Sequence, residues 1–289
     1  MTPRSSSRSP ANTRRIALLV FLGIAVLPAV IEAVYVSPTA VFMDERTKST
    51  QITIGNAGDQ AEEATIEVKF GFPDVDSAGT PYIRFVEDPG PEFNSAADWI
   101  RAFPQRVRLE PRSQQVVRLL ARPPDGLPDG EYYTRMIVTG RGATLRVNTG
   151  DSAVHAGVNL EIRLVTSVTY RKGRVTTGIG IRGLTAEAEG DSLSVWAHLV
   201  REGNAAYLGT AEVELLTPGG TIVRRWSTAL AVHYPVRRRF SYPLDSLATG
   251  DYRVRFRLRT RRPDLESYAP NAVLQAPTVM DSVAVRVFQ

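Results

Sequence analysis

Apolar and polar residues alternate with a period of two through most of this 289-residue sequence. Ala64–Phe72 reads ATIEVKFGF, and Ser192–Val200 reads SLSVWAHLV. Such alternation puts every second side chain on one face of an extended chain, so it predicts β-strands with one buried face. The same pattern recurs at Gln51–Asn56, Gln114–Ala121, Tyr132–Thr139, Val154–Tyr170, Ala211–Leu216, Thr221–Trp226, Arg238–Pro243, Tyr252–Thr260 and Asp281–Phe288.

Turn-forming residues separate these alternating segments. Asn56–Asp59 reads NAGD, Glu110–Ser113 reads EPRS and Pro218–Gly220 reads PGG. Glycine, proline, asparagine and aspartate favour tight turns, and many short strands joined by such turns are typical of sandwiches rather than of a parallel sheet. The sequence therefore predicts an all-β fold.

A short motif occurs twice, about one domain's length apart. Leu127–Tyr133 reads LPDGEYY and Leu247–Tyr252 reads LATGDY, so both contain Leu-x-x-Gly-acid-Tyr ahead of an alternating segment. In sandwich domains, a tyrosine near the start of a late strand often donates its hydroxyl hydrogen to the preceding corner. Tyr132 or Tyr133, together with Tyr252, fits this role. The two copies predict two sandwiches of related architecture, with chance recurrence of a short pattern as the alternative.

The first 33 residues differ in composition from the rest of the chain. Four arginines precede an apolar segment, Ile16–Ile31, and Ala33 provides a small residue after it. This is the order of a secretory signal peptide. The apolar segment is shorter than the roughly 20 residues that span a bilayer. We therefore expect a signal peptide over residues 1–33 and a periplasmic or otherwise exported protein, with an uncleaved membrane anchor as the alternative.

The composition also excludes several kinds of chemistry. The chain has no cysteine, which rules out disulfides, thiolate metal sites and a cysteine nucleophile. Its histidines, His155, His198 and His233, are too far apart in sequence for metal-ligand spacing. The net charge of +5 comes mostly from arginines in the first 33 residues, so the remainder has no basic excess for nucleic acid. We expect no enzyme, cofactor, metal, small-molecule substrate or nucleic-acid partner.

Residues 73–104 interrupt the alternation. This segment is rich in proline, glycine and acidic residues, so we expect a long connection there. Within it Asn94–Ala102 reads NSAADWIRA, which predicts one short helix because a capping residue precedes helix formers and Pro104 follows.

Further on, Lys172–Arg174 reads KGR and suggests a hinge. We expect one domain over residues 34–170 and a second over 171–289.

Four segments of the first domain resemble the periplasmic chaperones that assemble pili and related surface fibres. Val34–Phe42 (VYVSPTAVF) is similar to the family's first strand, Ser49–Gly58 (STQITIGNAG) to its second and Leu127–Val138 (LPDGEYYTRMIV) to a later one. Phe103–Leu119 (FPQRVRLEPRSQQVVRL) is the most specific match, with its order of Pro, Leu-x-Pro and Val-Arg-Leu. The resemblance covers residues 34–170 and implies two immunoglobulin-like β-sandwich domains in tandem, the second matching only as another sandwich.

The resemblance also implies a structural function. Members of the family lend an edge strand to a fibre subunit that lacks its own last strand. Such an incomplete sandwich exposes apolar side chains and unpaired backbone groups, which the added strand covers. Here the lending strand is Val154–Tyr170, and the expected partner is a secreted fibre or surface subunit, with an outer-membrane usher as a further partner. Its candidate partner-binding residues lie on one face of that strand: Val154, Ala156, Val158, Leu160 and Ile162.

Family members hold the subunit's terminal carboxylate with two basic residues, and this sequence matches one of them. The position directly after Pro-Thr on the first strand is Ala40, so the basic residue expected there is missing. Arg163, late on the lending strand, matches the second position and is the candidate carboxylate anchor. The alternative is that Arg163 is an ordinary solvent-facing strand residue.

Two functional hypotheses follow from these residues. If the apolar face from Val154 to Leu164 receives a partner, the protein is an exported chaperone that caps an incomplete fibre or surface subunit. If that face belongs to the core of the first domain, as most apolar strand faces do, the lending mechanism loses its support. The alternative function is a structural or adhesive cell-envelope protein that uses the same fold without subunit transfer, and Ala40 favours it.

Overall fold

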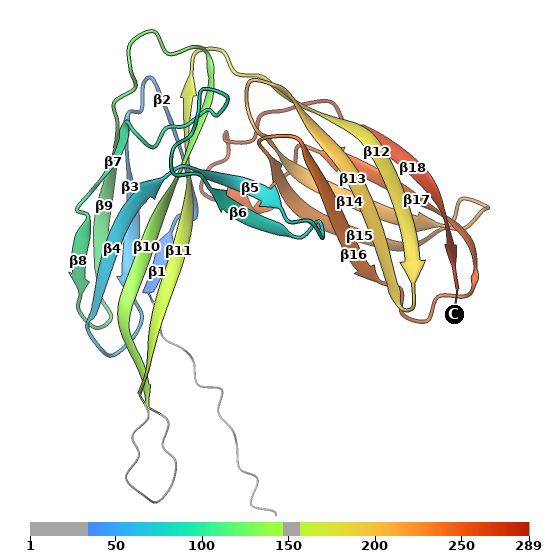
Figure 1. Ribbon diagram of the computed structural model, residues 1–289, viewed down its shortest axis with the longest axis horizontal. Helices are drawn as coiled ribbons and strands as arrows, with labels where there is room; N and C mark the ends of the chain where they lie inside the picture. Colours follow the sequence, from blue (N-terminus) through green and yellow to red (C-terminus); the bar gives the residue numbers. More distant parts are fainter. Residues whose placement is uncertain (1–33, 147–156, 289) are drawn as a thin grey trace, which may run out of the picture. The chain divides into compact units, whose positions relative to one another are not determined.

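The computed structural model describes residues 34–146 and 157–288, which are almost entirely β-structure (Figure 1). The expected signal peptide, residues 1–33, lies outside the described residues. Two pairs of sheets form two β-sandwiches, so the predicted all-β fold with tandem sandwiches is confirmed. In the described ranges, no helix is both long and apolar enough to cross a membrane.

The first sandwich consists of a four-stranded sheet and a five-stranded sheet. Their strand orders are β1-β3-β9-β7 and β2-β11-β10-β4-β8. Alternate residues from both sheets point inward and make one core, which includes Ile52, Leu119 and Val138. The strands are β1 (Val34–Ser37), β2 (Ala40–Asp44), β3 (Ser49–Asn56), β4 (Glu62–Lys69), β7 (Ile100–Phe103), β8 (Arg106–Leu109), β9 (Gln114–Ala121), β10 (Gly130–Arg146) and β11 (Gly157–Lys172).

The first extended segment of the chain is divided between the two sheets at Pro38. β1 pairs antiparallel with β3, whereas β2 pairs parallel with β11. Proline has no N–H to donate to a ladder, so a change of pairing partner at this residue is expected. The division leaves β2 alongside only the last part of β11, from Ser167 to Arg171.

The expected connection over residues 73–104 contains strands of its own. β5 (Gly71–Val75) and β6 (Pro81–Phe85) form an antiparallel hairpin. The hairpin tip contacts the second sandwich, because the Arg239 N–H donates to the carbonyl of Gly79 at 3.1 Å. This connection is therefore a projecting arm rather than an irregular loop.

The predicted helix over Asn94–Ala102 is wrong. The Ala96 N–H donates to the carbonyl of Tyr133, and the Tyr133 N–H donates to the carbonyl of Asn94, at 2.9 and 2.8 Å. These bonds hold the start of the segment beside β10, and Ile100 already belongs to β7. The helix-forming residues therefore complete a single turn before the chain becomes extended again.

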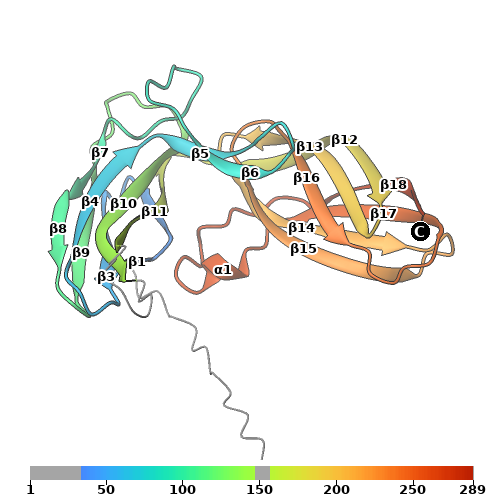
Figure 2. The same cartoon turned by 60° about the horizontal axis from the view of Figure 1, so that its bottom comes forward.

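The second sandwich consists of a three-stranded sheet, β12-β13-β16, and a four-stranded sheet, β15-β14-β17-β18. Its core is separate and includes Val195, Val213 and Phe256. Figure 2 shows α1 (Pro263–Glu266) in the long segment that joins β17 to β18. The strands are β12 (Thr177–Glu189), β13 (Ser192–Gly203), β14 (Tyr207–Leu216), β15 (Ile222–Val232), β16 (Val236–Pro243), β17 (Gly250–Arg259) and β18 (Val279–Val287).

Both copies of the Leu-x-x-Gly-acid-Tyr motif form the predicted corner. The Tyr132 hydroxyl donates to the carbonyl of Pro128, and the Tyr252 hydroxyl donates to the carbonyl of Ala248, each at 2.9 Å. Of the two tyrosines that the sequence left open, Tyr132 takes the corner position. The motif therefore marks equivalent places, the starts of β10 and β17, in two sandwiches.

The two sandwiches contact each other through an aromatic cluster beside the hairpin arm. Phe70 and Phe72 at the base of the arm pack with Tyr133 of β10 and Ala206 ahead of β14. The ring of Tyr234 meets that of Phe72 with centroids 4.5 Å apart. The expected division of the chain at residues 170 and 171 stays a prediction, and the observed strands end and resume at Lys172 and Thr177.

Candidate partner-binding edge and cleft

One side of β11 has two different environments along its length. Over Ser167–Arg171 it pairs with β2. Over 157–166 no strand in the described ranges pairs with it on that side, whereas β10 pairs with the other side throughout. The first ten residues of β11 thus form an edge that could accept another strand.

The backbone geometry of β11 determines which residues present hydrogen-bonding groups at this edge. The Ser167 N–H donates toward β2, to the carbonyl of Thr39 at 3.0 Å. In a strand, every second residue directs its backbone groups to the same side. The pairing with β10 is regular from Arg163 to Ser167, so the N–H and C=O of Arg163 and Val165 also point toward the open side.

Side chains on the inward face of β11 become less buried toward the open end. Val168 and Tyr170 are fully buried in the first core. Leu164 is half-buried and packs against that core, and Ile162 is half-buried. On the outward face, Val165 is 40% exposed. The apolar side chains near the C-terminal end of β11 are therefore fully buried in the core. Those toward the N-terminal end are buried only in part.

The predicted partner-binding residues fall in three groups. Val154 and Ala156 lie outside the described residues. Val158 and Leu160 lie on the open half of β11, with their backbones opposite Leu145 and Ala143 of β10. Ile162 lies on the inward, half-buried face of the same half. Val158, Leu160 and Ile162 therefore lie on the half of β11 that pairs with β10 on one side and is open on the other.

The two candidate anchor positions do not line the same cleft. Ala40 is the first residue of β2 and lines a cleft of about 360 Å³ at the end of the first sandwich. Arg163 is exposed on β11 and is not among the residues that line this cleft. Ala40 lies opposite Ser167, four residues along β11 from Arg163, which is about 13 Å at roughly 3.3 Å per residue. The two predicted anchor positions therefore do not meet in one cleft.

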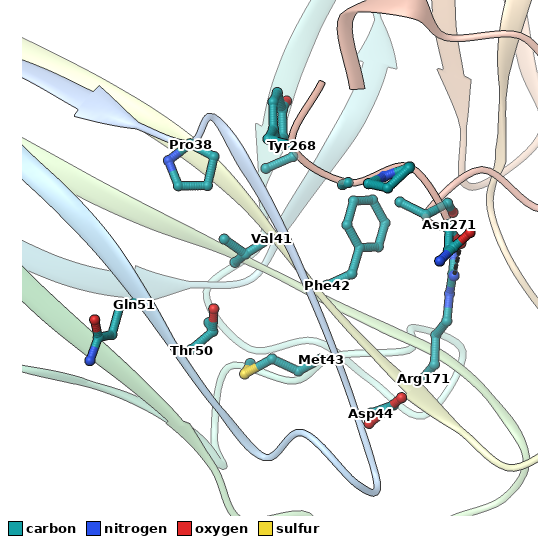
Figure 3. Close-up of a pocket in the computed structure, with 14 residues that line it drawn as sticks. Pro38, Val41, Phe42, Met43, Asp44, Thr50, Gln51, Arg171, Tyr268 and Asn271 are labelled. Carbon is teal, nitrogen blue, oxygen red and sulfur yellow. Dashed lines mark hydrogen bonds between the residues drawn. The ribbon is translucent and has the colours of Figure 1, made fainter. Parts of the chain in front are cut away.

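Figure 3 shows this cleft and the residues around it. One wall is β2, with Val41, Phe42 and Asp44, and the other is the segment from Tyr268 to Ala272 that follows α1. The Thr39 and Tyr268 hydroxyls lie 3.0 Å apart, which links the two walls. The cleft is thus bounded by both sandwiches.

Arg171 is the cationic residue in the described lining of the cleft, and its guanidinium is already engaged. Its Nε donates to Glu131 Oε1 at 2.7 Å, and its terminal nitrogens donate to the carbonyls of Asn271 and Ala272. The guanidinium also lies over the ring of Phe42, 5.2 Å from the centroid. Arg171 therefore joins the first sandwich to the segment after α1.

Sequence reasoning did not identify this arginine. Arg171 directly precedes the KGR segment that was interpreted as a hinge, so it was assigned to the boundary between domains. One signal was available. Glu131 is the acidic residue of the first Leu-x-x-Gly-acid-Tyr motif, and an antiparallel strand after β10 would bring a residue near its own end opposite Glu131, as Arg171 is.

The electrostatics at the end of β11 consist of local pairs. Lys172 Nζ contacts Glu45 Oε1, and the Gly173 N–H donates to Glu45 Oε2 at 3.0 Å. The hydrogen bond from Lys172 is the main reason that the pKa of Glu45 is lowered. In the parts of the chain that the structure describes, no group of histidine and acidic side chains is arranged to hold a metal ion.

Comparisons with known proteins found similar chains among solved structures. No family model matches the chain, and no curated protein matches it. The YadV chaperone is similar with a TM-score of 0.40 and 14% identity, over 87% of this chain and 98% of that one. The Salmonella enterica SafB chaperone, solved with SafA pilin, gives 0.40 and 14% over 87% and 96%.

A third similar structure is the CsuC–CsuE chaperone–tip adhesion subunit complex from Acinetobacter baumannii. Its TM-score is 0.38 at 14% identity, over 72% of this chain and 89% of that one. All three structures contain chaperones. The assignment of two tandem sandwiches rests on the strand pairings described above rather than on these matches.

Proposed function

We propose that this protein is an exported, non-enzymatic chaperone that binds an incomplete fibre or surface subunit along the open half of β11. The observation that carries the proposal is the division of β11. β2 pairs with Ser167–Arg171, and no described strand pairs with 157–166 on the same side. The periplasm is the compartment that the signal-like residues 1–33 and the partner class favour.

The edge of β11 has the two properties that strand addition requires. Backbone donors and acceptors at Arg163 and Val165 face the open side, so an incoming strand can continue the ladder. Ile162 and Leu164 are incompletely buried, so their alternate side chains can fill the groove of a sandwich that lacks a strand. A subunit bound in this way gains both hydrogen bonds and apolar cover.

A structural or adhesive envelope protein is the second candidate function. Ala40 stands where the resembling family has a basic anchor, and Arg171 in the same cleft is fully engaged within the protein. Both observations remove a fixed point for a subunit's terminal carboxylate. On this alternative the protein remains in the envelope and transfers no subunit.

A matched pair of substitutions at Arg163 tests the proposal. Arg163→Pro removes the N–H that faces the open side and keeps the ladder with β10, because the neighbouring even-numbered residues form that ladder. Arg163→Ala removes the guanidinium and keeps the N–H. Both variants and the wild-type chain are tagged, purified from native envelope extracts and checked for folding by thermal unfolding.

Strand addition predicts that Arg163→Pro loses the bound protein and that Arg163→Ala keeps it. Loss in both folded variants would assign the binding to the guanidinium of Arg163 rather than to its backbone N–H and would contradict strand addition at this residue. Retention by both variants would contradict binding at this edge. A retained protein supports the proposal only if its own sequence predicts a sandwich that lacks one strand.

A further inference from the structure

A second cavity, of about 170 Å³, lies on the outer face of the five-stranded sheet of the first sandwich. β10 and β11 form its floor, with Arg135 and Thr169 among the lining residues. His233 after β15 and Leu265 of α1 line it from the second sandwich, and Pro73 and Ile83 of the hairpin arm complete it. The cavity is separate from the open edge of β11, so an inference about it goes beyond the proposed function.

Two of the charged pairs at this cavity are internally balanced. Glu131 accepts the Arg171 Nε–H at 2.7 Å on one oxygen and the Ala206 N–H at 2.9 Å on the other. Arg262 donates to both oxygens of Asp264, at 2.8 and 2.6 Å. Each pair has no net charge, so neither provides an excess of either sign to the cavity.

Arg135 is a buried cation without a matching anion. It is 6% exposed, and its Nε donates to the carbonyl of Gly71 at 3.1 Å. It forms no ion pair with any residue that the structure describes. Burial lowers the pKa of Arg135 to about 10, so the side chain stays charged at neutral pH. An unpaired buried charge is costly, and a counter-charge at this position would stabilise the folded state.

His233 adds an unused hydrogen-bonding group at the same cavity. The residue is 4% exposed, and its Nδ1 has no partner in the described part of the chain. Its ring packs against Tyr133, with centroids 4.4 Å apart. Burial, reinforced by the charges of Arg135 and Arg201, keeps the pKa of His233 well below its usual value. The ring is therefore neutral, and one nitrogen can donate a hydrogen bond to an anion.

We infer that this cavity is a binding site for a small carboxylate anion, held by the guanidinium of Arg135 and by Nδ1 of His233. Among the lining residues and their ion-pair partners, the excess charge is a single positive charge, which a monocarboxylate balances. A guanidinium donates two parallel hydrogen bonds to a carboxylate, which matches the planar geometry of both groups. The cavity volume of about 170 Å³ is several times the roughly 30 Å³ that one water molecule occupies in the liquid, so an anion of acetate size fits. Leu208 and Ala231 provide apolar contacts for its methyl group.

The test uses sodium acetate as the probe on the full chain, with sodium chloride at equal ionic strength as reference. Two readouts are followed: the thermal unfolding midpoint and the ring C–H resonances of the histidines. We expect saturable stabilisation of about 5 °C by acetate beyond chloride. We also expect a resonance that is lost in His233→Gln to shift with the same saturation curve, because the bound anion contacts that ring.

Two variants test whether acetate acts at the cavity. Arg135→Met removes the excess charge, and Ala231→Leu fills the volume and keeps Arg135, so it remains informative if Arg135→Met fails to fold. The acetate-specific stabilisation should disappear in both. Equal midpoints in acetate and chloride for the wild-type protein would overturn the inference, as would unchanged acetate stabilisation in the folded Ala231→Leu variant.

Discussion

The two sandwiches carry the same acid–arginine pair in different surroundings. At the start of β10, Glu131 lies opposite Arg171 of β11, and at the start of β17, Asp251 lies opposite Arg286 of β18. In the first pair Glu131 is buried and Arg171 is half-buried, with 2.7 Å between nitrogen and oxygen, whereas the second pair is 3.7 Å apart and mostly exposed. The local sequence and register are alike, so the difference comes from what covers the sheet.

The outer face of β10 is covered by other segments of the chain, whereas the outer face of β17 is exposed at both ends and half-buried in its middle. Glu131, Tyr133 and Arg135 on β10 are all buried beneath parts of the second sandwich and the hairpin arm. On β17, Arg253 and Arg259 at alternate positions are exposed, whereas Arg255 and Arg257 are half-buried and form ion pairs with Glu214 and Glu212. Alternate polar residues on a strand therefore have different surroundings in the two sandwiches. On β10 they lie in a contact surface, and on β17 they partly face solvent.

The largest expected difference between the sandwiches is in these ion pairs. Glu131→Ala leaves Arg171 without its carboxylate in a buried site, so we expect the free energy of unfolding to fall by about 3–5 kcal/mol. Asp251→Ala removes the exposed counterpart and should cost less than about 1 kcal/mol. Urea unfolding of both variants measures the difference. Equal losses would show that the cover over β10 does not change the strength of the pair.

A smaller difference is expected between two glycines with similar backbone angles. Gly79, at the tip of the arm, has φ of 76° and Gly126 has φ of 72°. A Cβ at Gly79 would lie 2.6 Å from the Trp196 ring and 2.7 Å from the Arg239 backbone, whereas nothing lies within 4 Å at Gly126.

Both substitutions by alanine share the backbone strain of about 1–2 kcal/mol. Gly79→Ala should therefore destabilise the protein more than Gly126→Ala, because the arm must also move away from the second sandwich. Thermal unfolding measures this, and limited proteolysis within 73–85 shows whether the arm is released. Identical behaviour of the two variants would contradict the contact at the tip.

The covered face should also make stability depend on pH through His233. The pKa of His233 is held below its ordinary value of 6.5 by burial, so the folded state binds fewer protons than the unfolded state under acidic conditions. Stability should fall as the pH falls below about 6.5, by up to about 1.4 kcal/mol per pH unit.

His233→Gln removes this dependence, and His198→Gln, at an exposed position of β13, is the control. Unfolding is measured between pH 7 and pH 5 in buffers that contain no carboxylate, so that the proposed anion site does not affect the result. If the pH profile of His233→Gln matches that of the wild-type protein, another group is responsible.

The smallest effect should be the same in both sandwiches. Tyr132→Phe and Tyr252→Phe each remove one hydroxyl that donates to a backbone carbonyl four residues earlier. We expect each variant to lose about 1 kcal/mol of the free energy of unfolding, because a single hydrogen bond contributes about that much. A loss in one sandwich alone, measured by urea unfolding, would show that the two corners are not equivalent.

Local patterns in the sequence were sufficient to predict most strands. Each alternating segment overlaps an observed strand, because alternation follows directly from one buried face. β12 was missed since Thr177–Glu189 contains three glycines and few large apolar residues. The helix over Asn94–Ala102 was predicted from local propensity, and long-range backbone bonds to Tyr133 overrode that propensity.

The candidate sites depended more on contacts that a sequence does not reveal. Ala40 lines the cleft and Ile162 lies on the open half of β11, and their parts in partner binding stay predictions. Arg135 and Glu131 are indistinguishable from solvent-facing residues in the sequence, because their cover comes from segments about 50 to 130 residues away. Charge on an alternating strand is therefore a weak guide to which side faces water.

The short parallel pairing of β2 with β11 also limits the length of any strand that docks beside it. A docking segment can follow β11 toward its C-terminal end only as far as Thr166, because Ala40 and the residues after it occupy the next positions. The described edge, 157–166, spans about 33 Å at roughly 3.3 Å per residue. On the proposed function, a guest with a longer pleated segment would have to turn away from the sheet where the chain at Thr39 begins to cover β11.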